Sequence, residues 1–183
     1  MDRGGGTMAT WVSGLVKDVL DRNEQILMGA IEGLDQQELH AQIEPGANPI
    51  GWLLWHLSRV QDNHRSAMDG TPHVWIKDGW FEMFGRSSDP SDRGRGHTAQ
   101  QVHEFATPEL DTMIGYYRAV RSHTDAFLAA LDDQQLEREV PDLTGGATVP
   151  LQKRLEMLLV DCLQHSGQIA YLRGLIREQG WMS

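Results

Sequence analysis

Cysteine and basic residues are both scarce in this sequence. Cys162 is the single cysteine among 183 residues, so neither an intrachain disulfide nor a cysteine-rich zinc site can form, and any metal has to be held by histidines and carboxylates. Sixteen Lys and Arg stand against 26 Asp and Glu, which gives a net charge of −10. This balance argues against sequence-independent nucleic-acid binding and against attachment to an anionic membrane surface.

Long apolar runs are also missing. No run approaches the roughly 20 residues that a membrane-spanning helix needs, and the N-terminal MDRGGGTMATW has no apolar segment before a cleavage site. We therefore expect no secretory signal and a cytoplasmic protein. The glycines predict that residues 1–10 form a flexible tail. Hydrophobic residues at 40% and charged residues at 23% fit one globular domain over residues 1–183.

No stretch shows sustained period-two alternation flanked by hairpin turns, so we predict no strand. Apolar residues instead recur at steps of three and four over residues 11–34, 48–68, 107–131 and 151–180. Asn48-Pro49 and Thr107-Pro108 predict an N-cap residue followed by proline in the first helical turn. The sequence predicts an all-α four-helix bundle with a long connection, residues 70–106, between the second and third helices.

The long connection divides into two parts. The aromatic part, 73–84, is expected to lie ordered against the bundle, with Trp75, Trp80, Phe81 and Phe84 as anchors. The Ser-, Asp-, Gly- and Arg-rich part, 85–96, is expected to be mobile. Long excursions in small domains are commonly functional, and a site beneath this one would be partly shielded from water.

Two helical segments carry candidate metal ligands. Asp161 and His165 are four residues apart and share one helix face, a spacing that lets two side chains bind one ion. A surface ion pair explains the same spacing. His56 follows Trp52-Leu-Leu-Trp and is expected to point into the bundle, either as a ligand from a second helix or as a core histidine bonded to a buried carboxylate such as Asp161.

The remaining candidates are weaker. His64 lies two turns beyond His56 and is expected to border the same pocket. Cys162 is expected to pack in the core rather than act as a nucleophile. The other histidines stand in loops or polar stretches and are expected at the surface: His40, His73, His97, His103 and His123.

Two stretches resemble the DinB-like superfamily of metal-binding four-helix proteins, and within it the mycothiol-dependent branch. They are Asn48-Pro-Ile-Gly-Trp-Leu-Leu-Trp-His56-Leu and Thr148-Val-Pro-Leu followed by Asp161-Cys-Leu-Gln-His165-Ser-Gly-Gln-Ile-Ala-Tyr-Leu-Arg173. Many members have His-x-x-x-His in the last helix, whereas the mycothiol-dependent branch has a carboxylate there, usually glutamate. This chain departs from that branch by carrying the shorter Asp161. The resemblance implies a divalent ion held by His56, Asp161 and His165, and it also suggests a homodimer.

Two imidazoles and one carboxylate suit Zn²⁺ best and leave a fourth position open, although Ni²⁺, Co²⁺ or Mn²⁺ would also bind. An open position supports either hydrolysis by activated water or attack by a thiolate. One thiolate neutralises Zn²⁺ with one carboxylate, but hydroxide does the same.

The resemblance favours the thiol. We therefore expect a metal-dependent S-transferase of detoxification type that joins mycothiol, or a similar low-molecular-weight thiol, to a small electrophile. Gln168 and His64 are the expected catalytic residues, and Arg173 and Tyr117 are weaker candidates for binding substrate. A metal-dependent hydrolase and a non-catalytic, metal-binding stress-response bundle are the alternatives.

Overall fold

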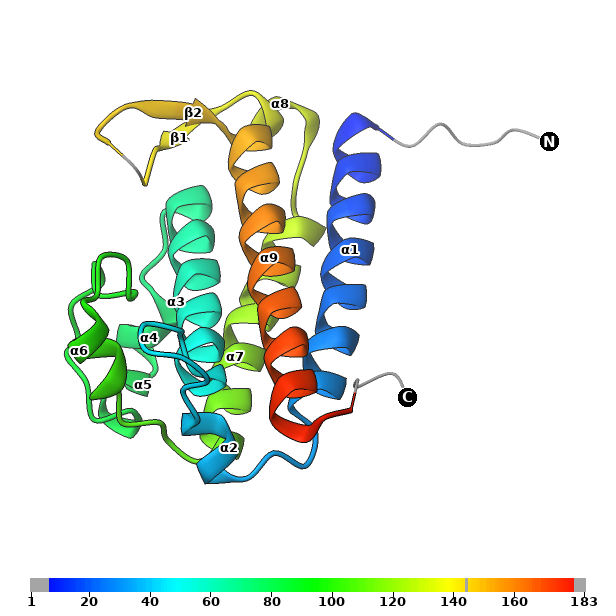
Figure 1. Ribbon diagram of the computed structural model, residues 1–183. Coiled ribbons are helices and arrows are strands. Elements are labelled where there is room, and N and C mark those ends of the chain that lie inside the picture. Colours follow the sequence, from blue (N-terminus) through cyan, green and yellow to red (C-terminus); the bar gives the residue numbers. More distant parts are fainter. Residues whose placement is uncertain (1–6, 144, 180–183) are drawn as a thin grey trace.

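Four long helices run alongside one another in the computed structural model, which describes residues 7–143 and 145–179. They are α1 (Met8–Ile31), α3 (Ile50–Asp69), α7 (Leu110–Ala129) and α9 (Leu151–Arg177). Helix α9 packs against α1 and α3, and α3 also packs against α7 (Figure 1). The predicted all-α four-helix bundle is confirmed.

The helix starts differ from the prediction. Pro49 and Glu109 are the N-cap residues of α3 and α7, without a side-chain cap, so the predicted Asn48 and Thr107 caps are wrong. Thr107 instead packs on Gly51, where a Cβ would lie 2.4 Å from its Cγ2. Helix α1 begins at Met8 behind a Thr7 cap, so the predicted tail is wrong for residues 8–10, and residues 1–6 lie outside the described residues.

A short hairpin precedes the last helix. Strands β1 (Glu139–Pro141) and β2 (Thr148–Pro150) pair antiparallel, with Val140 opposite Val149. The prediction of no strand is wrong because three residues per strand are too few to show alternation. Strand β2 leads directly into α9, which confirms the predicted start of that helix after Pro150.

The long connection packs against α3 through short helices. It contains α4 (Val74–Lys77), α5 (Trp80–Met83) and α6 (Ala99–His103), which lie beside α3 on the side away from α1 (Figure 1). Two further short helices, α2 (Gln36–His40) and α8 (Asp133–Leu136), lie in the other connections. Trp75 and Phe84 are buried against Tyr116 of α7, with ring centroids 5.2 and 5.7 Å away. The predicted aromatic anchoring is therefore confirmed.

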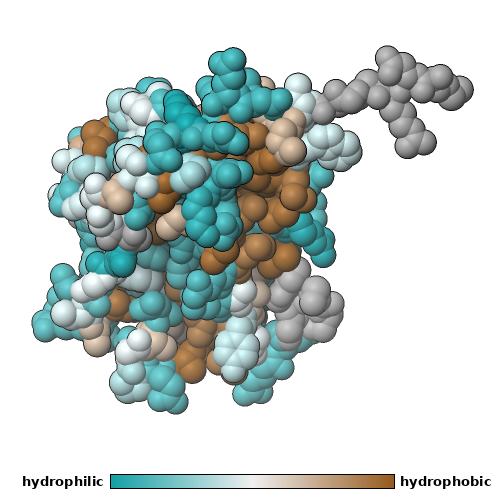
Figure 2. All heavy atoms as spheres, turned by 90° about the horizontal axis from the view of Figure 1, so that it is seen from above, coloured by the Kyte–Doolittle hydropathy of each residue, from teal (hydrophilic) through white to brown (hydrophobic). Residues whose placement is uncertain are grey.

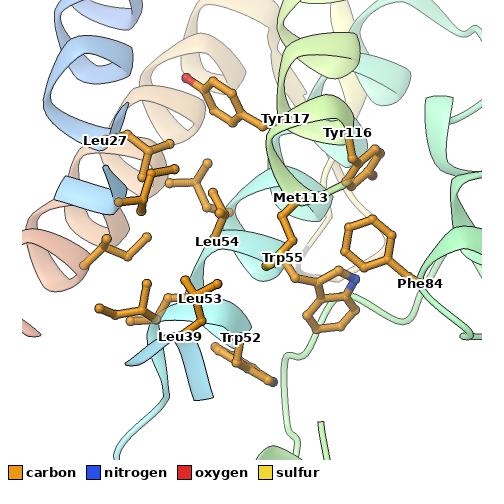
Figure 3. Packing of buried hydrophobic residues seen from close by; sticks show 14 of the residues in the cluster. Leu27, Leu39, Trp52, Leu53, Leu54, Trp55, Phe84, Met113, Tyr116 and Tyr117 are labelled. Carbon is orange, nitrogen blue, oxygen red and sulfur yellow. The ribbon is translucent and has the colours of Figure 1, made fainter. Parts of the chain in front are cut away.

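The main core joins all four long helices to this connection. Figure 3 shows Leu53, Leu54 and Trp55 of α3 between Leu27 of α1 and the α7 side chains, with Phe84 closing one side. Almost every residue of α3 is buried, including its polar ones. A helix in a bundle normally keeps a solvated face; here the connection covers the polar face of α3.

Hydrogen bonds from the polar face of α3 hold the connection at two places, near Val74 and near Pro90. The buried Asp62 carboxylate accepts hydrogen bonds from the backbone N–H groups of Val74 and Trp75 at 3.0 and 2.9 Å. Arg59 donates to the carbonyls of Pro90 and Asp92, each at 3.0 Å. The expectation that residues 85–96 are mobile is wrong, because a buried guanidinium needs these carbonyls as acceptors.

Hydrophobic residues also reach the surface. Seen from the end where α1 begins, brown hydrophobic residues gather toward α1 among a largely hydrophilic surface (Figure 2). The exposed apolar side chains on α1 and α9 include Met8, Trp11, Leu15, Val160 and Leu163. Within the described ranges, no helix combines the length and apolar character needed to cross a bilayer.

Candidate metal centre

His56 on α3 has one ring nitrogen engaged and one left over. Its Nδ1 lies against the carbonyl oxygen of Arg93, and because a carbonyl only accepts, Nδ1 must carry the hydrogen. The lone pair then sits on Nε2. The ring stacks on Trp52 at 4.8 Å and meets the ring of His165 edge-on at 4.6 Å. A histidine fixed through Nδ1 to a carbonyl, with Nε2 free, is the usual arrangement of a metal ligand.

His165 on α9 is oriented in the same way. Its Nδ1 lies 2.8 Å from Oε1 of Gln168, which leaves Nε2 facing Oδ1 of Asp161 at 3.7 Å. A lone pair and a carboxylate repel each other unless a proton or another cation lies between them. The two side chains therefore face each other, and a proton or another cation between them would stabilise this arrangement.

Asp161 contacts a second histidine as well. Its Oδ2 lies 3.3 Å from Nε2 of His64, and His64 is buried on α3. With Nε2–H donating to Asp161, the lone pair of His64 is on Nδ1, which has no partner among the described residues. The prediction that His64 borders the same pocket as His56 is confirmed.

Burial and charge set the protonation of these groups. Burial lowers the pKa of His56 to about 4 and also lowers the pKa of His64, so both are neutral at pH 7. Burial opposes ionisation of Asp161 and His165 too, but their mutual attraction prevails, together with the hydrogen bonds from His64 to Asp161 and from His165 to Gln168. The pKa of Asp161 is lowered and the pKa of His165 is raised. Asp161 is therefore a carboxylate at neutral pH.

A pocket of about 510 Å³ adjoins these side chains. His56, His64 and Asp161 line it, together with residues of the connection and the start of α9. His97 lines it too, accepting from Trp52 Nε1 at 3.2 Å and lying 3.2 Å from Asp92. The expectation that His97 is a surface residue is wrong, because the segment predicted to be mobile folds over α3.

The comparisons with known proteins agree with the helical arrangement. The family model described as "DinB superfamily" matches residues 20–169. The chain belongs to the DinB superfamily. A crystal structure of a conserved protein from Enterococcus faecalis superposes with a TM-score of 0.80 and 22% identity, covering 96% of this chain and 100% of that one. At this identity the likeness shows the fold alone. A search of curated proteins finds no match.

Members of the DinB superfamily are often metal-dependent enzymes, and the donor atoms here suit a divalent ion. Two imidazole nitrogens and one carboxylate oxygen are the set that binds Zn²⁺ with an open position, and His165 would have to be unprotonated to act as a ligand. Nevertheless, no group of three or more His, Cys, Asp or Glu in residues 7–143 and 145–179 has its side chains arranged to hold an ion. The side chains contact one another in pairs rather than around one point. The three-residue ligand set is therefore a prediction, and its donor atoms are of the types that bind Zn²⁺.

The residues predicted to contact substrate lie in different places in this DinB fold. Gln168 is exposed next to His165. Arg173 donates to the carbonyls of Ala30 and Glu32 at the end of α1, at 3.2 and 2.8 Å, and Tyr117 is buried in the core. Neither lines the pocket. Cys162 is buried, as predicted, and burial raises the pKa of its thiol to about 12.

The pocket residues missed by sequence reasoning include two arginines that contact other parts of the chain. Arg154 lies seven residues before Asp161 and therefore on the same face of α9, a signal that spacing could have revealed. Arg93 stands in the segment that was expected to be mobile, and nothing in its local sequence indicates that it folds back onto His56.

Proposed function

We propose that this chain is a metal-dependent thiol S-transferase, with His56, Asp161 and His165 as the ligands of a divalent ion, Zn²⁺ by preference. The observation that carries the proposal is the pair formed by Asp161 and His165 Nε2 beside His56, at the edge of a pocket. A carboxylate in place of a third histidine is what the chain shares with the mycothiol-dependent branch. A volume of about 510 Å³ is large enough for small-molecule substrates.

The bound ion would lower the pKa of a thiol, which is near 8.5 in free cysteine, so that the thiolate is present at neutral pH. The residues of the chain would do the rest. His64 donates through Nε2 to Asp161 and thereby orients the carboxylate. We assign His64 Nδ1, neutral and without a hydrogen-bond partner among the described residues, to accept the proton as the thiol ionises. The thiolate sulfur then bonds to the electrophilic carbon while the leaving group departs from that carbon with its electron pair. Gln168 holds the ring of His165.

Thiol dependence tests this proposal. The purified, zinc-loaded chain is mixed with monochlorobimane as electrophile, with and without mycothiol, and formation of the thioether is followed by fluorescence. We expect turnover only with the thiol, and loss of both turnover and bound zinc in His165→Ala. His123→Ala, on α7 outside this pocket, serves as the matched control. Equal consumption of the electrophile without thiol would exclude the transferase and favour the hydrolase.

A non-catalytic role would show differently. In that case zinc would bind at one equivalent but neither thiol nor water would react at the site. The partners named here, a low-molecular-weight thiol and a small electrophile, belong to the same proposal. The suggested homodimer also remains a prediction; the exposed apolar side chains of α1 and α9 are compatible with it.

A further inference from the structure

The pocket beside the candidate metal centre has an excess of positive charge. Its lining includes three arginines, Arg93, Arg95 and Arg154, but one acidic residue, Asp161. This contrasts with the whole chain, whose net charge is −10. Cationic walls around a partly desolvated pocket concentrate anions within it. The ligand set proposed above uses none of these arginines.

Arg154 is fully buried and incompletely paired. Its Nη2 donates to the carbonyl of Pro141 and lies 3.6 Å from Oδ1 of Asp142, while Nε and Nη1 have no hydrogen-bond acceptor in the described part of the chain. Burial lowers the pKa of its guanidinium, and the charge of Arg93 adds to this effect. Buried N–H groups without an acceptor are costly, and an anion in the pocket would supply the missing acceptors.

Arg93 supplies a second guanidinium. It is half-buried and donates to the carbonyl of Leu143 at 3.1 Å. Burial lowers its pKa first, the charges of Arg95 and Arg59 act in the same direction, and the charge of Asp161 opposes them. Both neighbouring cations therefore favour an anion close to Arg93.

The backbone holds this arginine-bearing segment firmly. Gly94 has φ of +88°, and a Cβ there would lie 2.5 Å from Trp52 and 3.0 Å from Trp55. Only glycine tolerates both the left-handed conformation and the close approach. Arg93 and Arg95 are thus fixed on either side of a residue pressed against α3, which is the preorganisation that an anion site needs.

We propose that this pocket binds a small molecule through an anionic group, a carboxylate or a phosphate, held by Arg93 and Arg154 next to His64 and Asp161. Guanidinium groups match the planar carboxylate and the phosphate oxygens with paired hydrogen bonds. The inference extends the proposed function and rests on it in one respect: in the transferase, one of the two substrates carries this group. The binding itself requires neither metal nor thiol.

Isothermal titration calorimetry on the metal-free, thiol-free full chain tests the proposal. Inorganic phosphate and succinate are titrated separately at constant ionic strength, with sodium chloride as the reference for screening. We expect saturable binding of at least one of them to the wild type, weakened about tenfold or more by Arg93→Gln and Arg154→Lys. Arg118→Gln, an exposed arginine of α7 with the same charge change, should bind as the wild type does.

The variants separate binding from folding. Arg154 also ties β1 to α9, so its replacement can disturb the hairpin. Arg93→Gln keeps the backbone carbonyl that His56 uses, and its circular dichroism should match the wild type. The proposal is overturned if phosphate and succinate bind no better than chloride, or if a folded Arg93→Gln binds as tightly as the wild type. The better-bound anion identifies the carboxylate or phosphate class. If the enzyme turns over without thiol but still binds phosphate in this pocket, the proposed transferase activity is overturned and the anion site stands.

Discussion

Each carboxylate oxygen of Asp161 faces a different histidine, His64 on one side and His165 on the other. The charge of this residue is therefore central to the candidate centre.

Asp161→Asn keeps the size of the side chain but removes its charge. We expect zinc affinity to fall by about 100-fold or more, beyond the 10–100-fold typical of losing a partner of a ligand. Asp161→Glu should retain binding, because it restores a carboxylate at the position. Competition with a fluorescent zinc chelator measures both, and Asp111→Asn on the exposed start of α7 is the control. Unchanged affinity in Asp161→Asn would remove Asp161 from the ligand set.

Cys162 provides a prediction about pH. Burial, reinforced by the charge of Asp161, raises the pKa of its thiol from 9.0 to about 12. The thiol should therefore remain protonated throughout pH 7–9, and a thiolate-specific reagent such as Ellman's should not label the native chain there. Addition of urea should make one thiol react. Labelling of the native chain at the rate of free cysteine would show that the side chain is accessible.

At the scale of helices and loops, sequence periodicity indicated the long helices well. Apolar spacing located α1, α3, α7 and α9 to within a few residues, because each buries a continuous stripe. It could not reveal the path of the connection, whose contacts are backbone carbonyls bound by Arg59 and backbone N–H groups bound by Asp62. Such contacts depend on the position of the backbone, so the residue types in the connection do not indicate them.

Asp62→Asn should loosen that connection. The substitution leaves Arg59 and Arg65 without their buried carboxylate, which lies 3.8 and 3.1 Å away. We expect a loss of about 3–5 kcal/mol in the free energy of unfolding, as for other broken buried ion pairs, and faster proteolysis within residues 71–93. Chemical denaturation and limited trypsin digestion measure these effects.

Asp69→Asn is the matched control for that experiment. Asp69 also pairs with Arg65, at 2.9 Å, but its side chain is 19% exposed, so its loss should cost much less. Equal destabilisation by the two variants would mean that the Asp62 contacts do not hold the connection.

At the scale of the molecule, metal binding should be visible as stability. A ligand that binds the folded chain at about 100 times its dissociation constant adds about 2.7 kcal/mol. For a chain of 183 residues this corresponds to a rise in Tm of about 5–10 °C. Differential scanning calorimetry with zinc should show the rise in the wild type and in His123→Ala. Its persistence in His56→Ala would place the ion elsewhere.

The family, the bundle and a pocket beside His56 could be inferred from the sequence, whereas the arginines that line the pocket could not be placed there. The segments around His56 and Asp161 to His165 hold both the helical pattern and the resemblance, so the candidate ligands were identified. The positive charge of the pocket comes in part from Arg93 and Arg154, which are 61 positions apart in the sequence. The folded connection and the hairpin bring them to the same pocket.

Arg93 contributes both its backbone carbonyl and its side chain to the site. Its carbonyl accepts from His56, whereas its side chain faces the pocket. Every amino acid has that carbonyl, so position 93 can change its side chain without releasing the histidine. In the proposed enzyme, a change at this one position can therefore alter the molecules accepted while the candidate ligands stay in place, and a library of variants at position 93 is the starting point for testing new substrates.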